Sequence, residues 1–138
     1  MTIWTEKAIT MIRKAETKAY TMNHAQLDPL HLLWAFLEGG PQVEQMARTM
    51  DLDPDMVSQA AEQELGRMPV EKDFEVSSPN ESLRRLFLRA VDLGATSPVV
   101  RQEGLIGRRE LMLALTEDSG RAGALVRNFE TAGDPIQG

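Results

Sequence analysis

The sequence predicts an all-α fold built from two copies of a four-helix unit, related by a pseudo-two-fold axis. Apolar residues recur at intervals of three and four along most of the chain, and a segment of the first half reappears in the second. No segment of useful length alternates with the period of two that a strand requires, so a sheet has little support. We expect about seven or eight short helices, none of which is long enough to be stable alone.

Apolar stripes at helical spacing place four of these helices. They run over residues 8–22, 57–68, 83–94 and 122–129. The segment Gly39–Pro41 is expected to end one further helix and to open the next, because glycine ends helices readily and proline is tolerated in the first turn.

Three helix starts carry a side-chain acceptor followed directly by proline: Asp28–Pro29, Asp53–Pro54 and Ser78–Pro79. Such an acceptor caps a free backbone N–H, and proline lacks an N–H that would have no partner at this position. Ser78 is also followed three residues later by Glu81, which predicts a capping box.

The repeat sets the domain organisation. Residues 31–38 align position by position with residues 110–117, and the helix around Ala15 and Ala19 aligns with the helix around Ala90 and Gly94. We therefore expect one domain over residues 1–138, with a first repeat at about 4–68, a linker at 69–77 and a second repeat at about 78–133. Phe74, the aromatic residue of the polar linker, is expected to pack into a groove.

Composition and charge exclude some classes of function. The 138 residues carry a net charge of -6, which opposes nucleic-acid binding, and cysteine is absent. The longest apolar run, Leu32–Leu37, is far too short to span a membrane. We expect a soluble cytoplasmic protein that binds neither nucleic acid nor a membrane.

No pattern of catalytic or cofactor-binding residues is apparent. His24 and His31 have no carboxylate or cysteine at metal-ligand spacing, and His31 is expected to accept a hydrogen bond at the start of its helix. Nucleophile motifs and the phosphate-binding loop motif are both missing. We expect no catalytic residue, no metal and no cofactor. The methionines on the apolar stripes fit either core filling or an adaptable binding groove.

These residues together resemble the N-terminal domain of the Clp family of AAA+ unfoldases, and most closely that of the ClpB disaggregase type. The resemblance covers essentially the whole chain. It is carried by Ala15-x3-Ala19, the segment Leu27–Leu37, the segment Leu65–Pro69, Ser78-x4-Leu83 and Glu110-Leu-x2-Ala-Leu115.

The resemblance implies a non-catalytic domain tethered to ATPase modules of the same chain, which alone would bind ATP. Such a domain receives exposed apolar segments of unfolded or aggregated proteins, or an adaptor protein. It would be monomeric when isolated, and its parent would be a hexamer. The alternatives are a stand-alone adaptor or regulator, and the N-terminal domain of a ClpA, ClpC or type VI secretion ATPase that binds an adaptor or a helical peptide.

The resemblance also implies a substrate-binding groove formed by Thr5, Phe87, Glu103, Glu110 and Leu111. Thr5 could equally be an ordinary helix cap, and Glu110 a charge at a helix start. Leu88, which lies off the apolar stripe of its helix, could extend the floor of the groove. Arg89 stands where the family often has an apolar residue.

Overall fold

The computed structural model describes residues 3–97 and 104–128, and these residues form seven helices. The helices are α1 (Glu6–Thr21), α2 (Pro29–Leu37), α3 (Pro41–Thr49), α4 (Pro54–Leu65), α5 (Glu81–Ala95), α7 (Arg108–Thr116) and α8 (Arg121–Asn128). The all-α prediction is confirmed. One small addition is a parallel pair of two-residue strands, β1 (Gln26–Leu27) and β2 (Ser78–Pro79). The expected end of the second repeat, near residue 133, lies outside the described residues.

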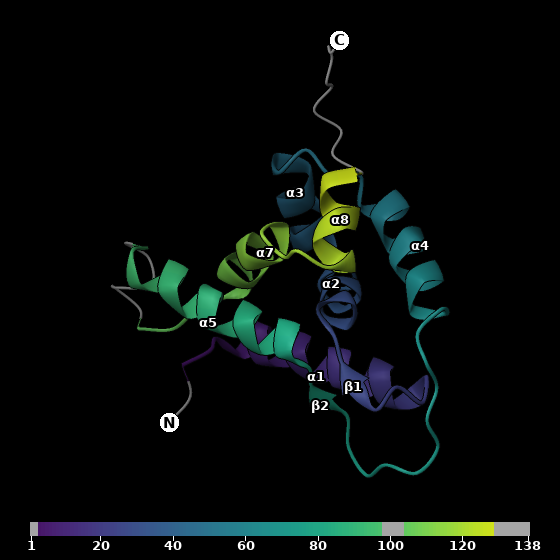
Figure 1. Cartoon of the computed structure of the whole chain (residues 1–138). Helices are drawn as coiled ribbons and strands as arrows, with labels where there is room; N and C mark the ends of the chain where they lie inside the picture. Colours follow the sequence, from purple (N-terminus) through teal and green to yellow (C-terminus); the bar gives the residue numbers. More distant parts are fainter. Residues whose placement is uncertain (1–2, 98–103, 129–138) are drawn as a thin grey trace.

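Helix α2 lies at the centre of the molecule. In Figure 1 it is behind α8 and between α7 and α4, and it contacts α1, α3 and α5 as well. All of its residues except Trp34 are buried. A helix that is apolar on every side is stable only when other elements cover it completely, which accounts for this position.

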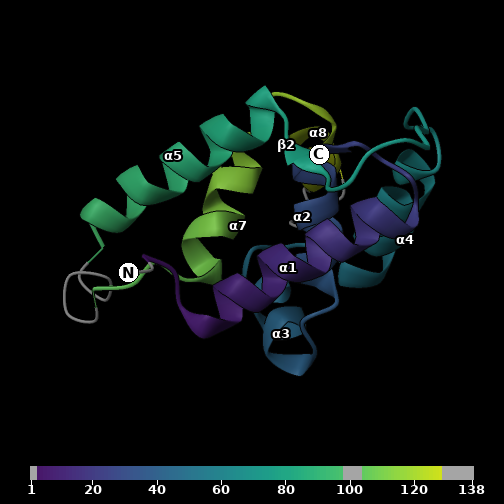
Figure 2. The same cartoon turned by 90° about the horizontal axis from the view of Figure 1, so that it is seen from below.

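The two halves of the chain repeat one packing unit. α1 packs on α2 as α5 packs on α7, and these are the pairs that the sequence repeat aligns. In Figure 2, α7 and α2 lie between α5 and α1, so that α1 and α5 flank the buried pair. Both flanking helices carry a buried stripe on one side only; in α1 it consists of Ala8, Met11, Ala15 and Ala19.

Two of the predicted helix caps are confirmed. Asp28 Oδ2 accepts a hydrogen bond from the Leu30 N–H at 2.8 Å, and Asp53 Oδ1 accepts from the N–H groups of Asp55 and Met56. Helix α3 begins after Gly40, whose φ of 88° lies in the region that favours glycine.

The predicted cap at Ser78 is wrong. The N–H groups of Ser78 and Asn80 donate to the carbonyls of Ala25 and Leu27, which holds this segment extended beside β1. Pro79 therefore lies in the strand β2, and the helix starts two residues later than predicted. Asn80 is the cap, and its Oδ1 accepts a hydrogen bond from the Leu83 N–H at 2.9 Å.

Residues 69–77 contain no helix, as their lack of helical periodicity predicts, and this segment is hydrogen-bonded to the turn that follows α1. The Glu71 N–H donates to the Asn23 carbonyl, and Ser77 Oγ donates to the His24 carbonyl at 2.6 Å. Phe74 is half-buried, and its ring lies edge-on to Tyr20 with 5.8 Å between the ring centroids. It rests against Tyr20, an exposed side chain of α1, and its packing into a groove stays a prediction.

The corrected cap gives a direct test. Asn80→Ala removes the acceptor for the Leu83 N–H and also the 2.7 Å hydrogen bond from Asn80 Nδ2 to Asp28 Oδ1. We expect the free energy of unfolding, measured by denaturant titration, to fall by about 1 kcal/mol or more. Ser78→Ala is the matched control, because the Ser78 side chain caps nothing. An equal loss of stability in both variants would contradict the assignment.

Candidate functional site

The start of the chain is fastened to the segment that leads into α7. The Thr5 N–H donates to the Ile106 carbonyl at 2.9 Å, and the Ile106 N–H donates to the Ile3 carbonyl at 2.7 Å. Trp4 and Ile106 form a parallel bridge. This contact between distant parts of the sequence brings the start of α1 beside the start of α7.

Thr5 and Glu110 meet on either side of Gly107. A Cβ atom built on Gly107 would lie 3.7 Å from both Thr5 Oγ1 and Glu110 Oε1. Thr5 Oγ1 accepts from the Ala8 N–H at 3.1 Å and caps α1, whereas Glu110 Oε1 accepts from the Gly107 N–H at 2.9 Å at the start of α7. The structure thus brings two of the predicted site residues together, and both act as helix caps.

An apolar recess opens beside this junction, between α1 and α5. It has a volume of about 260 Å³, and we call it the apolar pocket. Its walls are the half-buried side chains of Trp4, Ile9, Ile12 and Phe87. The rings of Trp4 and Phe87 lie 5.7 Å apart at an interplanar angle of 58°, an arrangement that aromatic pairs favour. The exposed side chains of Arg13 and Glu16 complete the rim.

The remaining predicted site residues lie elsewhere. Leu111 is fully buried in the core, so it can only pack beneath the residues of the site. Leu88 is 67% exposed on α5 but does not line the apolar pocket. Glu103 lies outside the described residues. Among the described residues, Phe87 is therefore the one predicted side chain that forms a wall of the pocket.

Sequence reasoning missed Trp4, Ile9 and Ile12 as pocket residues. The helical spacing of apolar residues places Ile12 on the stripe that includes Ala8 and Ala15, whereas Ile9 lies off that stripe. An apolar residue off the stripe near the start of an otherwise polar helix face was the available signal. For Trp4 no local signal exists, because its position depends on the bridge to Ile106.

A second cluster of polar side chains is buried at the start of α2. His31 Nδ1 accepts from the Asp28 N–H at 3.0 Å, which confirms the expected role at the helix start. His31 Nε2 lies 2.9 Å from His24 Nδ1. Because Nδ1 of His31 is an acceptor, its proton is on Nε2 and is donated to His24. Both rings are then neutral, and the arrangement is structural.

Burial lowers the pKa of both histidines. For His31 the pKa falls to about 4, first because burial penalises the charged ring and then because His24 and Lys18 are nearby. Asp28 opposes this shift in part. The pKa of His24 is lowered by burial and then by Lys18. Among residues 3–97 and 104–128, no group of three or more histidine, aspartate or glutamate side chains is arranged to hold a metal ion.

Comparison with known proteins decides the family. A family model described as the Clp repeat (R) N-terminal domain matches residues 3–129, which is nearly the whole chain. The chain belongs to the Clp N-terminal domain family. This confirms the predicted resemblance and the repeat architecture. No curated protein sequence matches this Clp N-terminal domain significantly.

Solved structures share its fold. The Hsp104 N-terminal domain from Candida albicans matches with a TM-score of 0.73 and 19% sequence identity, over 91% of this chain and 80% of that one. A structure described as part of a malarial protein secretion system matches with a TM-score of 0.73 and 12% identity, over 96% and 87% of the two chains. The N-terminal domain of the chaperone ClpD from Arabidopsis thaliana matches with a TM-score of 0.65 and 18% identity, over 91% and 84%. In the part of this Clp N-terminal domain that the structure describes, no helix is both long enough and apolar enough to cross a bilayer.

The histidine pair makes stability depend on pH. Folding lowers the pKa of His31 from 6.5 to about 4, so folding favours the neutral ring. The stability that depends on the neutral ring is complete above pH 6.5 and is lost as the pH falls towards about 4. In urea titrations between these pH values, the chain should lose more stability than the variant with His24→Gln and His31→Gln. Parallel pH profiles for the two proteins would contradict this.

Thr5→Ala tests the cap on α1. The variant should lose about 1 kcal/mol of unfolding free energy, because the Ala8 N–H loses its acceptor. Thr5→Ser keeps the hydroxyl and should retain most of the stability. Thermal melts of both variants give the comparison, and an unchanged melting temperature in Thr5→Ala would show that the hydroxyl is not needed as a cap.

Proposed function

We propose that this Clp N-terminal domain is the substrate-recognition domain of a ClpB-type ATP-dependent disaggregase. In this proposal its apolar pocket receives exposed apolar segments of unfolded or aggregated proteins. The observation that carries the proposal is the pocket itself, in which four half-buried apolar side chains from α1, α5 and the residues before α1 face a recess open to solvent.

The chemistry of the pocket suits an unselective receptor. Apolar walls contribute binding energy in proportion to the apolar area they cover and impose little sequence preference. Arg13 and Glu16 provide one charge of each sign at the rim, so neither acidic nor basic segments are strongly favoured. A pocket of about 260 Å³ takes one or two side chains, which predicts weak binding at a single site.

Weak binding at one site fits a domain that acts in several copies. Copies tethered to one ring would raise the local concentration of sites around a substrate, and the combined affinity would exceed that of one copy. The domain itself would carry out no chemistry, and ATP would be hydrolysed by modules that these residues do not contain. Membership of the Clp family supports this separation of substrate binding from ATP hydrolysis.

The ClpB subtype is supported by residues rather than by fold. The fold likeness extends to the Hsp104 and the ClpD N-terminal domains, so it does not distinguish the subtypes. The dipeptide Met68–Pro69 after α4 favours ClpB. The capped helix start expected at Ser78 would also favour it, but Asn80 caps α5 instead. A separately encoded adaptor or regulator of a Clp ring is the alternative, and stable capture of a separate Clp ATPase subunit by this chain would favour it.

Fluorescence anisotropy with a labelled peptide of leucine, phenylalanine, serine and glutamine tests the pocket. This uncharged probe should bind the chain, and Phe87→Ala should weaken binding by about tenfold because it removes one wall. Val70→Ala is the matched control, since Val70 is 60% exposed in the linker and does not line the apolar pocket.

Equal binding by Phe87→Ala and the unaltered chain would contradict the proposal, as would an equal loss in Val70→Ala. Because Phe87 also packs against the core, thermal melts must show that the variant is folded. Ile9→Ser provides a second pocket variant at a half-buried position of α1 and should weaken binding in the same way.

A further inference from the structure

A second recess, chemically unlike the apolar pocket, lies between the first half of α1, the end of α2 and the starts of α3 and α7. Its volume is about 280 Å³. Lys7, Lys14 and Arg108 bring three positive charges to it, and the buried side chains of Met11 and Phe36 lie at its floor. We call it the cationic recess.

Among the described residues, the three cations have only neutral oxygens as hydrogen-bond partners. Lys7 Nζ donates to Gln42 Oε1 at 2.6 Å, and Arg108 Nη2 donates to the same oxygen at 3.4 Å. Lys14 Nζ donates to the backbone carbonyl of Glu38 at 3.4 Å. Within the described parts of the chain, none of the three forms an ion pair with a carboxylate. Lys7 and Arg108, both positively charged, therefore donate to the same neutral amide oxygen. An anion would be a stronger acceptor for both side chains and would reduce the repulsion between them.

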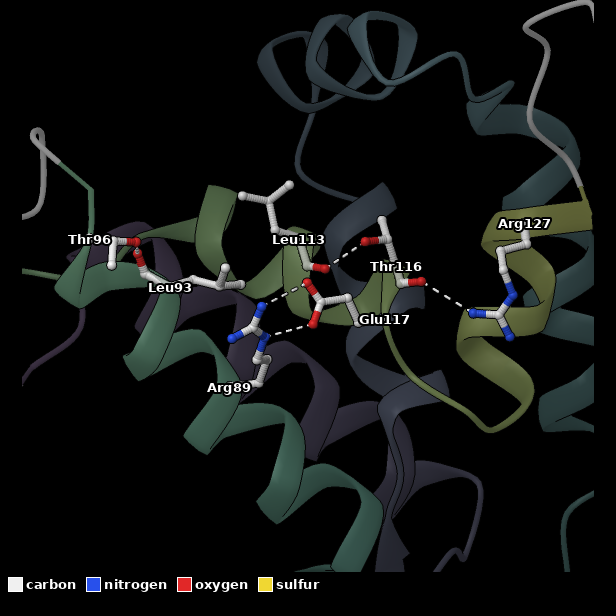
Figure 3. Close-up of polar contacts among 7 residues, drawn as sticks. All are labelled: Arg89, Leu93, Thr96, Leu113, Thr116, Glu117 and Arg127. Atoms are coloured by element: carbon white, nitrogen blue, oxygen red, sulfur yellow. Dashed lines mark hydrogen bonds and ion pairs between the residues drawn. The ribbon is translucent and has the colours of Figure 1, made fainter.

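The second repeat shows how the same position can be neutralised internally. The repeat places Arg89 of α5 where α1 has Lys14, and Glu117 where α2 is followed by Glu38. Arg89 reaches across to Glu117 with two contacts, of 2.6 and 3.3 Å, as Figure 3 shows. In the first repeat Lys14 bonds to the Glu38 backbone instead, and Lys7 stands where the second repeat has Ser82. At this one position the first repeat thus leaves Lys14 without a carboxylate partner, whereas the second repeat pairs Arg89 with Glu117.

We propose that the cationic recess binds an acidic peptide segment of a partner protein, in which carboxylates flank an apolar side chain. The planar guanidinium of Arg108 matches a carboxylate, and the flexible ammonium groups of Lys7 and Lys14 can follow neighbouring carboxylates along a strand. The apolar floor gives a site for the side chain between them and offers nothing to a small inorganic anion. Glu38 also lines the recess, and its single negative charge is outnumbered by the three cations.

The net negative charge of the chain favours binding of an acidic segment at the recess over binding elsewhere on the surface. With a net charge of -6, the protein repels an acidic segment over most of its surface, so attraction is restricted to the place where cations gather. The cationic recess and the apolar pocket use different sides of α1: Lys7, Lys14 and Met11 line the first, and Ile9 and Ile12 line the second. The two sites can therefore be tested separately, and this inference does not depend on the proposed function.

The test is an anisotropy titration with a labelled peptide in which aspartates and glutamates surround one leucine. Lys7→Gln combined with Arg108→Gln should weaken binding by about tenfold or more, and added salt should weaken it in the unaltered chain. Lys72→Gln combined with Arg84→Gln is the matched control, because it removes the same charge at exposed positions outside the recess and should change binding little. Lys14→Gln alone provides a second recess variant should the double variant be unfolded in thermal melts.

Three results would overturn the proposal. Equal weakening in the control variant would mean that only net charge matters. If a peptide with glutamine and asparagine in place of glutamate and aspartate bound as tightly as the acidic peptide, the recess would not recognise negative charge. Full displacement of the peptide by millimolar inorganic phosphate would assign the recess to a small anion. Unchanged binding in Phe87→Ala would show that the peptide does not use the apolar pocket, which keeps the two proposals distinguishable.

Discussion

The short helix α2, buried at every residue except Trp34, is the constraint on which the rest of this structure depends. The first turn of α2 has backbone N–H groups without helical partners, and its position at the centre of the molecule keeps water from them. Asp28 accepts a hydrogen bond from the Leu30 N–H, and His31 accepts one from the Asp28 N–H. The other ring nitrogen of the buried His31 needs a hydrogen-bond partner, which is His24. At the start of α7, the counterpart of α2, the buried carboxylate of Glu110 accepts a hydrogen bond from the Gly107 N–H.

Burying these two helices leaves α1 with several distinct surfaces. One side of α1 packs into the core through its alanine stripe, while the two flanks remain accessible as the apolar pocket and the cationic recess. Since the helix is anchored by Thr5 at its start and by the bridge from Trp4 to Ile106, both flanks are presented on a rigid element. Rigid placement reduces the ordering cost of binding, which matters for sites as small as these.

Most of the fold could be predicted from the sequence because helical periodicity and caps are local signals. His31 was assigned correctly from its position three residues after Asp28 and from Glu110 at the equivalent position of the second repeat. Ser78 was not, because a long-range pairing with residues 25–27 holds it extended and passes the cap to Asn80. The site follows the same rule: the resemblance supplied Thr5, Phe87 and Glu110, whereas the pocket wall at Trp4 follows from a contact between distant segments that no local pattern encodes.

Both proposed sites require α1 to offer two separate binding faces on a fixed frame. Amide chemical-shift mapping of the isotope-labelled chain, titrated with the uncharged apolar peptide, tests this most directly. We expect shifts to concentrate on Trp4, Ile9, Ile12 and Phe87, with the amides of Lys7 and Lys14 and those of α2 unmoved. Shifts spread through α2, or confined to the linker 69–77, would contradict it.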